Sequence, residues 1–222
     1  MTNLNLDQAR FNMVEQQIRT WTVLDPATLD MLMNTPREPF VPAAYRQLAY
    51  ADIEIPLAHG QSMLFPKIEG HMHQAVAPKA DDIVLEVGTG SGFLTALLAK
   101  SAKHVYSVDY HQDLLNQAAA NLKSQGIENV TLEQGDASQG WDRHAPYDCI
   151  VISGAMPEVP EAYKTALAIG GRLFVVLGDP NGGAQIATLI TRTWATHWDS
   201  KHLFETQLPY LINGEKKAEF QF

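Results

Sequence analysis

The sequence predicts an α/β protein with a doubly wound, mostly parallel sheet and an N-terminal helical and irregular extension. Two observations carry this prediction. From about residue 81 to residue 178, short apolar and β-branched runs alternate with helix-like stretches, as in parallel strands joined by helices. A glycine-rich turn directly follows the first of these runs, at the strand end where open α/β sheets bind their ligands.

The 222 residues are expected to form a single domain with three consecutive parts. Residues 1–80 form the helical, lid-like extension and residues 81–178 form the core around the glycine turn. Residues 179–222 supply C-terminal elements that complete the sheet, namely a strand or helix at 186–193 and a strand around 203–211.

The N-terminal part begins with two predicted helices. Apolar residues recur on one face of the first at helical spacing: Phe11, Val14, Ile18 and Trp21. Asp25 predicts the N-cap of the second helix, with Pro26 at its first position. Four prolines then exclude one continuous helix before residue 60: Pro36, Pro39, Pro42 and Pro56.

The glycine-rich turn follows an apolar strand expected at residues 83–87. Glycine permits positive φ angles and a close approach of the backbone to a ligand. A dinucleotide fingerprint has its third glycine one position later and binds a pyrophosphate. Here a carboxylate precedes the turn, which suits a ligand with an ammonium and a sulfonium group. The pattern therefore predicts S-adenosylmethionine (SAM) as the cofactor, bound by Glu86, Gly88, Thr89, Gly90 and Gly92.

Acidic residues end the next two predicted strands. Asp109 lies roughly 20 residues beyond the turn, where a ribose-binding carboxylate belongs. Asp136 follows the third strand, where it would accept a hydrogen bond from the adenine amino group while the backbone of Ala137 donates to the ring. Either aspartate could instead be a helix N-cap or a turn residue.

Composition and charge exclude several classes of protein. The net charge of −9 argues against a broad nucleic-acid surface, which needs basic patches. No apolar run approaches the ~20 residues of a membrane span, and the first residues do not read as a signal peptide. The single cysteine, Cys149, lies in an apolar run and excludes an intrachain disulfide, so a cytoplasmic protein is expected.

No metal site is expected. His71 and His73 are two positions apart, and on a helix this spacing places their rings on different faces. They are interpreted as surface histidines.

Several segments beyond the glycine turn resemble the protein-L-isoaspartate O-methyltransferase family, and the likeness covers nearly the whole chain. The most specific segment is Pro-Arg-Glu-Pro-Phe-Val-Pro at residues 36–42. The resemblance implies a Rossmann-like, class I SAM-dependent methyltransferase fold and a monomer. It also implies that the loop at residues 60–66 covers the cofactor and meets the substrate, and that SAM is contacted by Glu86, Gly88, Gly90, Asp109 and Asp136.

The chain departs from the family in two places. The family loop typically reads Gly-Gln-Thr-Ile-Ser-x-Pro, with the serine assigned to the active site, whereas this chain has Leu64 there and Ser62 at the threonine position. Our hypothesis is that Ser62 takes over the catalytic positioning, although it could be an ordinary loop serine. At the strand end 151–157, Met156 is expected to reshape the substrate pocket.

The resemblance implies methyl transfer to the carboxylate of L-isoaspartyl or D-aspartyl residues in damaged proteins, which initiates repair. Such a carboxylate has a reference pKa near 4, so it is ionised at neutral pH and needs alignment rather than a general base. One alternative is a methyltransferase of tRNA adenine or of a small molecule. Another is a SAM-binding homologue with weak catalysis.

Overall fold

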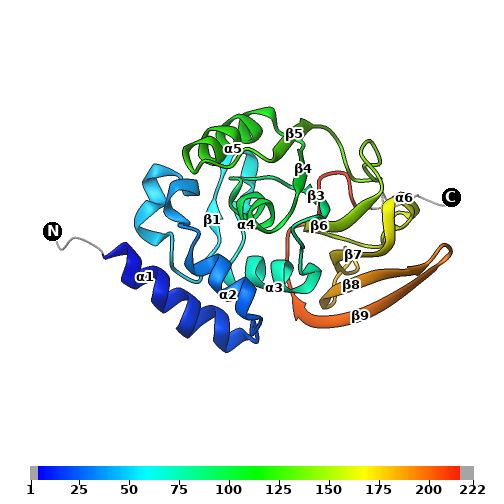
Figure 1. The fold of residues 1–222 in the computed structure, drawn as a ribbon, viewed down its shortest axis with the longest axis horizontal. Helices are drawn as coiled ribbons and strands as arrows, with labels where there is room; N and C mark the ends of the chain where they lie inside the picture. Colours follow the sequence, from blue (N-terminus) through cyan, green and yellow to red (C-terminus); the bar gives the residue numbers. More distant parts are fainter. Residues whose placement is uncertain (1–4, 216–222) are drawn as a thin grey trace.

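The computed structural model describes residues 5–215. Its centre is a seven-stranded sheet in the order β5-β4-β3-β6-β7-β8-β9 (Figure 1). The pairs from β5 to β7 are parallel, and β8 and β9 are added antiparallel, so the predicted mostly parallel sheet is confirmed. The strands are β3 (Ile83–Val87), β4 (His104–Asp109), β5 (Val130–Gln134), β6 (Tyr147–Met156), β7 (Leu167–Leu177), β8 (Gln185–Trp194) and β9 (His197–Thr206).

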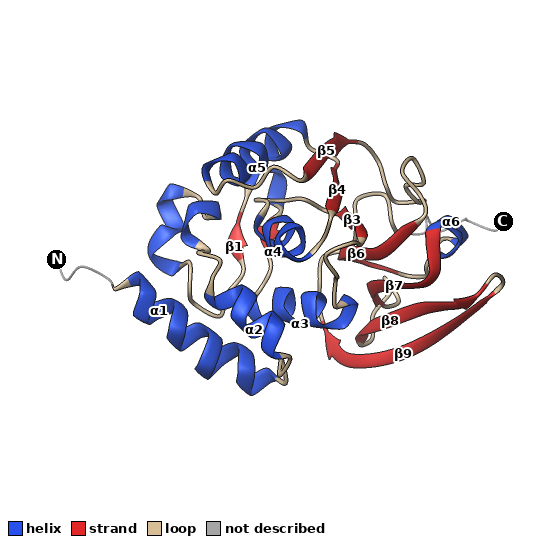
Figure 2. Ribbon diagram, in the orientation of Figure 1, coloured by secondary structure: helices blue, strands red, loops and turns tan. Residues whose placement is uncertain are grey.

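Helices cover both faces of this sheet. Figure 2 shows α3, α4 and α5 on the side of the N-terminal region and α6 on the other side. Alternate residues of a strand point to opposite faces of the sheet, and each face packs into its own hydrophobic core. The strands are therefore apolar on both faces. Val84 and Val151 belong to the core beneath the N-terminal region, whereas Leu85 and Ile150 belong to the opposite one. The helices are α3 (Pro66–Val76), α4 (Phe93–Ser101), α5 (Gln112–Ser124) and α6 (Glu161–Ala166).

The N-terminal region combines short helices with a small two-stranded ribbon. As predicted, Asp25 caps α2, because its carboxylate accepts a hydrogen bond from the backbone N–H of Thr28 at 2.8 Å. The α-helices are α1 (Leu6–Asn12) and α2 (Pro26–Met33), and the ribbon pairs β1 (Ile55–Pro56) with β2 (Ser62–Met63). The remaining turns are π-helical at Met13–Ile18 and 3₁₀ at Arg19–Trp21, Glu38–Phe40, Ala43–Leu48 and Ala58–Gly60.

The predicted apolar face of the first helix is only partly correct. Val14 and Ile18 are fully buried, but Phe11 is 48% and Trp21 50% exposed. The helix widens into the π turn at Met13–Ile18 and then tightens into a 3₁₀ turn. Residues three and four apart therefore no longer share one face.

The interpretation of His71 and His73 as surface residues is wrong, because they are only 7% and 4% exposed. Helix α3 is covered on several sides, by α2, α4, β6 and β7. The ring of His73 lies between the hydroxyls of Thr28 and Ser101, with both nitrogen–oxygen distances at 2.9 Å. Burial lowers the pKa of His73 to about 4, so its ring is neutral at pH 7.

The C-terminal part also differs from the prediction. Residues 186–193 lie within a strand, β8, but the strand that follows is His197–Thr206, the last one among the described residues, and it ends before residue 211. The chain then returns to β6, where the N–H of Leu211 donates to the carbonyl of Ala155 at 2.9 Å. Residues 216–222 of the predicted third part lie outside the described residues.

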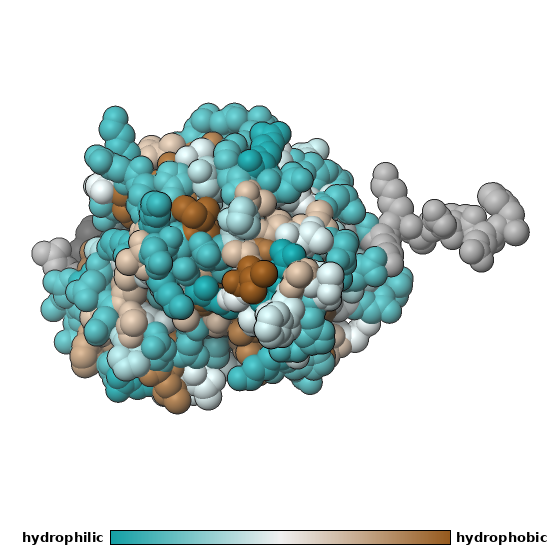
Figure 3. Space-filling view, turned by 45° about the vertical axis from the view of Figure 1, so that its right-hand side comes forward, coloured by the Kyte–Doolittle hydropathy of each residue, from teal (hydrophilic) through white to brown (hydrophobic). Residues whose placement is uncertain are grey.

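In the face drawn in Figure 3, apolar side chains form small groups within a mostly hydrophilic surface. Among residues 5–215, no helix combines the length and apolarity needed to cross a membrane.

Candidate active site

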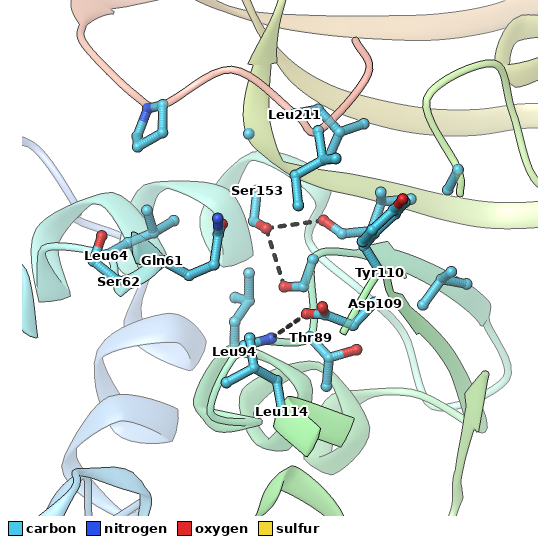
Figure 4. Close-up of a pocket in the computed structure, with 18 of the residues that line it drawn as sticks. Gln61, Ser62, Leu64, Thr89, Leu94, Asp109, Tyr110, Leu114, Ser153 and Leu211 are labelled. Carbon is cyan, nitrogen blue, oxygen red and sulfur yellow. Dashed lines mark hydrogen bonds between the residues drawn. The ribbon is translucent and has the colours of Figure 1, made fainter. Parts of the chain in front are cut away.

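A pocket opens at the carboxyl ends of β3, β4 and β6, where an open α/β sheet binds its ligand (Figure 4). It encloses about 940 Å³ of space free of protein atoms, part of it in its open mouth. The glycine turn after β3 forms one wall and the loop after β1 forms another. Among the predicted site residues, the lining includes Ser62, Gly88, Thr89, Gly90, Asp109, Asp136 and Ala137.

The glycines of the turn are required by its geometry. Gly88, Gly90 and Gly92 have φ angles of +94°, +53° and +85°, a region that side chains disfavour. A Cβ atom on Gly88 would also collide with the hydroxyl of Ser153, which lies 2.9 and 3.0 Å from the carbonyl oxygens of Val87 and Gly88. Gly92 is not in the pocket lining. Instead it lets α4 begin close to Ala118 of α5.

Asp109 braces the turn from the next strand. One carboxylate oxygen accepts from the backbone N–H of Gly90 and the other from that of His111, both at 2.9 Å. The side chain also lines the pocket, although it is only 8% exposed. These contacts place a carboxylate at the strand end where the sequence predicts a ribose ligand.

Glu86 lies beneath the turn rather than on the pocket wall, since it is fully buried and not part of the lining. One carboxylate oxygen accepts from the hydroxyls of Thr95 and Ser107 at 2.5 Å. The other, Oε1, is buried without a hydrogen-bond partner in the described chain. Burial raises the pKa of Glu86 to about 8, so a nearby cation would favour its ionised form.

Asp136 and Ala137 line the pocket just after β5. The Asp136 carboxylate accepts from the backbone N–H of Ser138 at 2.9 Å and from the Asn213 amide at 2.8 Å. Burial opposes ionisation, but these hydrogen bonds hold the pKa of Asp136 below its ordinary value. The hydroxyl of Tyr163 donates to the carbonyl of Ala137 and fixes that backbone.

The loop that carries Ser62 and Leu64 is tied down at several points. Both residues line the pocket, and Ser62 pairs with Pro56 in the β1–β2 ribbon. The guanidinium of Arg37, fully buried, donates to the carbonyl of Leu64 at 2.7 Å and forms an ion pair with Glu69. The loop therefore has a defined position over the glycine turn.

Some lining residues were not found from the sequence. Glu69, Tyr110 and Ser153 line the pocket, as does the segment 209–212 that returns from β9. The segment packs so closely that a Cβ on Gly154 would lie 3.0 Å from the backbone nitrogen of Leu211. Of these residues, only Tyr110 could have been predicted from the sequence, because it directly follows Asp109 at the end of a predicted strand.

The expectation for Met156 is wrong. Its side chain is 1% exposed and packs in the core on the α6 side, outside the pocket lining. The expectation came from the family resemblance, in which this strand end faces the substrate. Here a register shift between β6 and β7, from Val151 to Ala155, precedes Met156, which pairs with Leu177. Ser153 and Gly154 face the pocket instead.

The charges of the pocket match a cationic nucleoside. Its described lining contains three carboxylates, those of Glu69, Asp109 and Asp136, and no lysine, arginine or histidine. A pyrophosphate would meet no cationic side chain here, whereas a ribose, an ammonium and a sulfonium suit these acceptors. The unpartnered oxygen of Glu86 below the turn adds further capacity for positive charge. The residues present therefore fit SAM better than a dinucleotide.

Comparisons with known proteins agree with this geometry. The family model of protein-L-isoaspartate(D-aspartate) O-methyltransferase matches residues 8–209. Protein-L-isoaspartate O-methyltransferase 1 of Rhodopseudomonas palustris (strain HaA2) is 40% identical over 206 residues, which cover 93% of this chain and 84% of that protein. The enzyme of the same name from Synechococcus sp. (strain JA-2-3B'a(2-13)) is 37% identical over 91% of this chain and 85% of its own.

Solved structures agree on the fold. A chain described as a protein-L-isoaspartate O-methyltransferase of Plasmodium falciparum, in complex with S-adenosyl-L-homocysteine, superposes with a TM-score of 0.77 at 19% identity, covering 91% of this chain and 97% of that one. A second structure of this name has a TM-score of 0.75 at 25% identity, covering 90% and 65%. The match over residues 8–209 and the relatives at 37–40% identity show that the chain belongs to the protein-L-isoaspartate(D-aspartate) O-methyltransferase family.

Proposed function

We propose that this protein transfers a methyl group from SAM to the side-chain or main-chain carboxylate exposed by an L-isoaspartyl or D-aspartyl residue in a damaged protein. The observation that carries the proposal is one cavity lined both by the glycine turn and by the loop 61–64. The turn would hold the cofactor, and the loop beside it would meet the acceptor. Family membership then favours the isoaspartyl acceptor among the possible ones.

The chain's own residues would hold the cofactor as follows. SAM supplies a methyl group activated by a positively charged sulfonium. Asp109 would accept hydrogen bonds from the ribose hydroxyls, and Asp136 and the backbone of Ala137 would bind the adenine. Glu86, whose pKa burial raises to about 8, would become ionised beside the bound positive charge.

The acceptor side needs orientation rather than proton removal. A peptide carboxylate is ionised at neutral pH, and the described lining offers no histidine or lysine as a base. We assign orientation of the acceptor to Ser62, because Leu64 at the family serine position has no hydrogen-bonding side chain. The half-buried Ser62 hydroxyl would donate to a carboxylate oxygen, while Leu64 helps to exclude water.

A three-acceptor assay tests the proposal. Purified protein and labelled SAM are incubated with an isoaspartyl peptide, its normal aspartyl twin and bulk tRNA. We expect base-labile methyl ester on the isoaspartyl peptide alone. Methylated tRNA would support the adenine alternative, and SAM binding without transfer to any acceptor would support a catalytically weak homologue.

We further propose that the protein works as a cytoplasmic monomer that binds no nucleic acid. The resemblance to the family favours a monomer, and the described pocket lining carries no basic side chain for a phosphate backbone. The single Cys149 is buried in β6 and needs no oxidising compartment. Sedimentation at working concentrations tests the monomer.

A further inference from the structure

Three side chains that can ligate a metal meet at the rim of the cofactor pocket. His59 lies at the tip of the loop between β1 and β2, and His111 and Asp113 lie at the start of α5. Each offers one ligand atom, and these atoms all lie within 4.8 Å of one another. His59 and Asp113 are 54 residues apart, so no local motif marks the cluster in the sequence.

The cluster is already organised. His59 Nε2 lies 2.8 and 2.9 Å from the two carboxylate oxygens of Asp113. The His59 ring stacks on that of His111, with centroids 4.0 Å apart and planes within 7° of parallel, so one ring must turn for both nitrogens to face a common ion. The backbone of His59 is left-handed, at φ 57° and ψ 26°, an uncommon conformation for a residue with a side chain.

We propose that His59, His111 and Asp113 form a site for a divalent transition-metal ion such as Zn²⁺. Two imidazoles and one carboxylate are a ligand set that Zn²⁺ accepts, with a fourth position left for water. The metal takes the place of the hydrogen bond between His59 Nε2 and Asp113, and the neutral His59 ring then carries its one proton on Nδ1. Nitrogen and oxygen ligands of one tetrahedral Zn²⁺ ion lie about 3.3 Å apart. The widest ligand-atom separation, at most 4.8 Å, would therefore shorten on binding, whereas His59 Nε2 and the Asp113 oxygen, now 2.8 Å apart, would separate slightly.

A metal at this place would clip the two walls of the pocket together. His59 is two positions before Gln61, and His111 is two positions after Asp109, and both Gln61 and Asp109 line the pocket. Tyr110, at the mouth, packs its ring against the edge of the His111 ring with centroids 5.3 Å apart. A bound ion would therefore restrain the loop 57–61 and slow exchange of the ligand beneath it.

Zn²⁺ titration of the tag-free protein by calorimetry tests the site. We expect one equivalent to bind, and His59→Ala or Asp113→Asn to weaken binding by roughly tenfold or more. The matched control is His197→Ala on β9, because His197 forms a more exposed pair with Asp199 at 3.1 Å and belongs to no three-ligand cluster among the described residues. Absence of stoichiometric binding, or equal weakening by His197→Ala, would overturn the site.

A second measurement tests the clip. Release of S-adenosyl-L-homocysteine is followed by stopped flow with and without Zn²⁺, and the ion should slow release several-fold in the unmodified protein but not in His59→Ala. An unchanged rate would overturn the clip. This measurement rests on the proposed cofactor, whereas the titration does not, so the two failures are distinguishable.

Discussion

The guanidinium of Arg37 donates a hydrogen bond of 2.7 Å to the backbone carbonyl of Leu64, across 27 positions of sequence. Arg37 belongs to the 36–42 segment, which carries the strongest family resemblance, and Leu64 lies at the position where the family has its serine. The contact therefore connects the 36–42 segment to the loop that lines the pocket. The first holds the second against the pocket, with Glu69 as the partner that compensates the buried charge.

Removing this buried arginine should destabilise the fold. Arg37→Met leaves Glu69 without its cation in a site that is 3% exposed, and breaking such a pair costs about 3–5 kcal/mol. Urea unfolding of the single and double variants measures this cost. Because Glu69→Met in the same chain removes the unpaired charge, the Arg37→Met/Glu69→Met variant should recover a large part of the loss. A double variant that is as unstable as the sum of the two single ones would contradict the pairing.

Ser62 and Leu64 can be separated by kinetics. Ser62→Ala should lower kcat/KM for an isoaspartyl peptide by about 10- to 100-fold, since a hydrogen bond to a charged group contributes about 1.5–3 kcal/mol. The dissociation constant for SAM should not change. Leu64→Ser should restore part of the activity to Ser62→Ala. Unchanged turnover in Ser62→Ala would remove Ser62 from the active site.

Asp109 should control cofactor affinity. Asp109→Ala removes the predicted ribose acceptor and the brace on Gly90, and we expect the dissociation constant for SAM to rise about 10- to 100-fold. Calorimetric titration measures it, with the exposed Asp199→Ala as the control that should bind normally. An Asp109→Ala variant with native affinity would contradict the assignment.

The pH dependence of stability should report His73. Burial lowers its pKa from 6.5 to about 4 in the folded protein, so the unfolded chain binds the extra proton first. Its contribution is therefore present above pH 6.5 and is lost as the pH falls toward 4, by an amount on the order of 3 kcal/mol. Urea unfolding between pH 4 and 7 should show a shallower slope for His73→Gln than for His197→Gln. Equal slopes would exclude His73 as the source.

The core of the fold could be predicted because its signals are local. The apolar runs, the glycine turn and the Asp25 cap each depend on neighbouring residues, and each forms as predicted. Asp109 and Asp136 could be placed because the ends of adjacent parallel strands meet at one edge of the sheet.

The wrong predictions concern residues whose surroundings are formed by distant parts of the chain. His73 is buried because α2 and α4 cover α3, and Met156 turns away because a register shift interrupts β6. Glu86 lies below the pocket wall, which the sequence pattern does not distinguish from lying on it. The cluster of His59 with Asp113 depends on the same long-range packing.

The most direct test of the account is the ratio of kcat/KM values for an isoaspartyl peptide and its aspartyl twin, with mass spectrometry to locate the added methyl group. The two peptides have the same composition and differ only in which carboxyl group enters the main chain. We expect rapid transfer to the isoaspartyl carboxylate and none detectable to the twin. Equal rates for the two peptides, or no transfer to either while SAM binds, would contradict it.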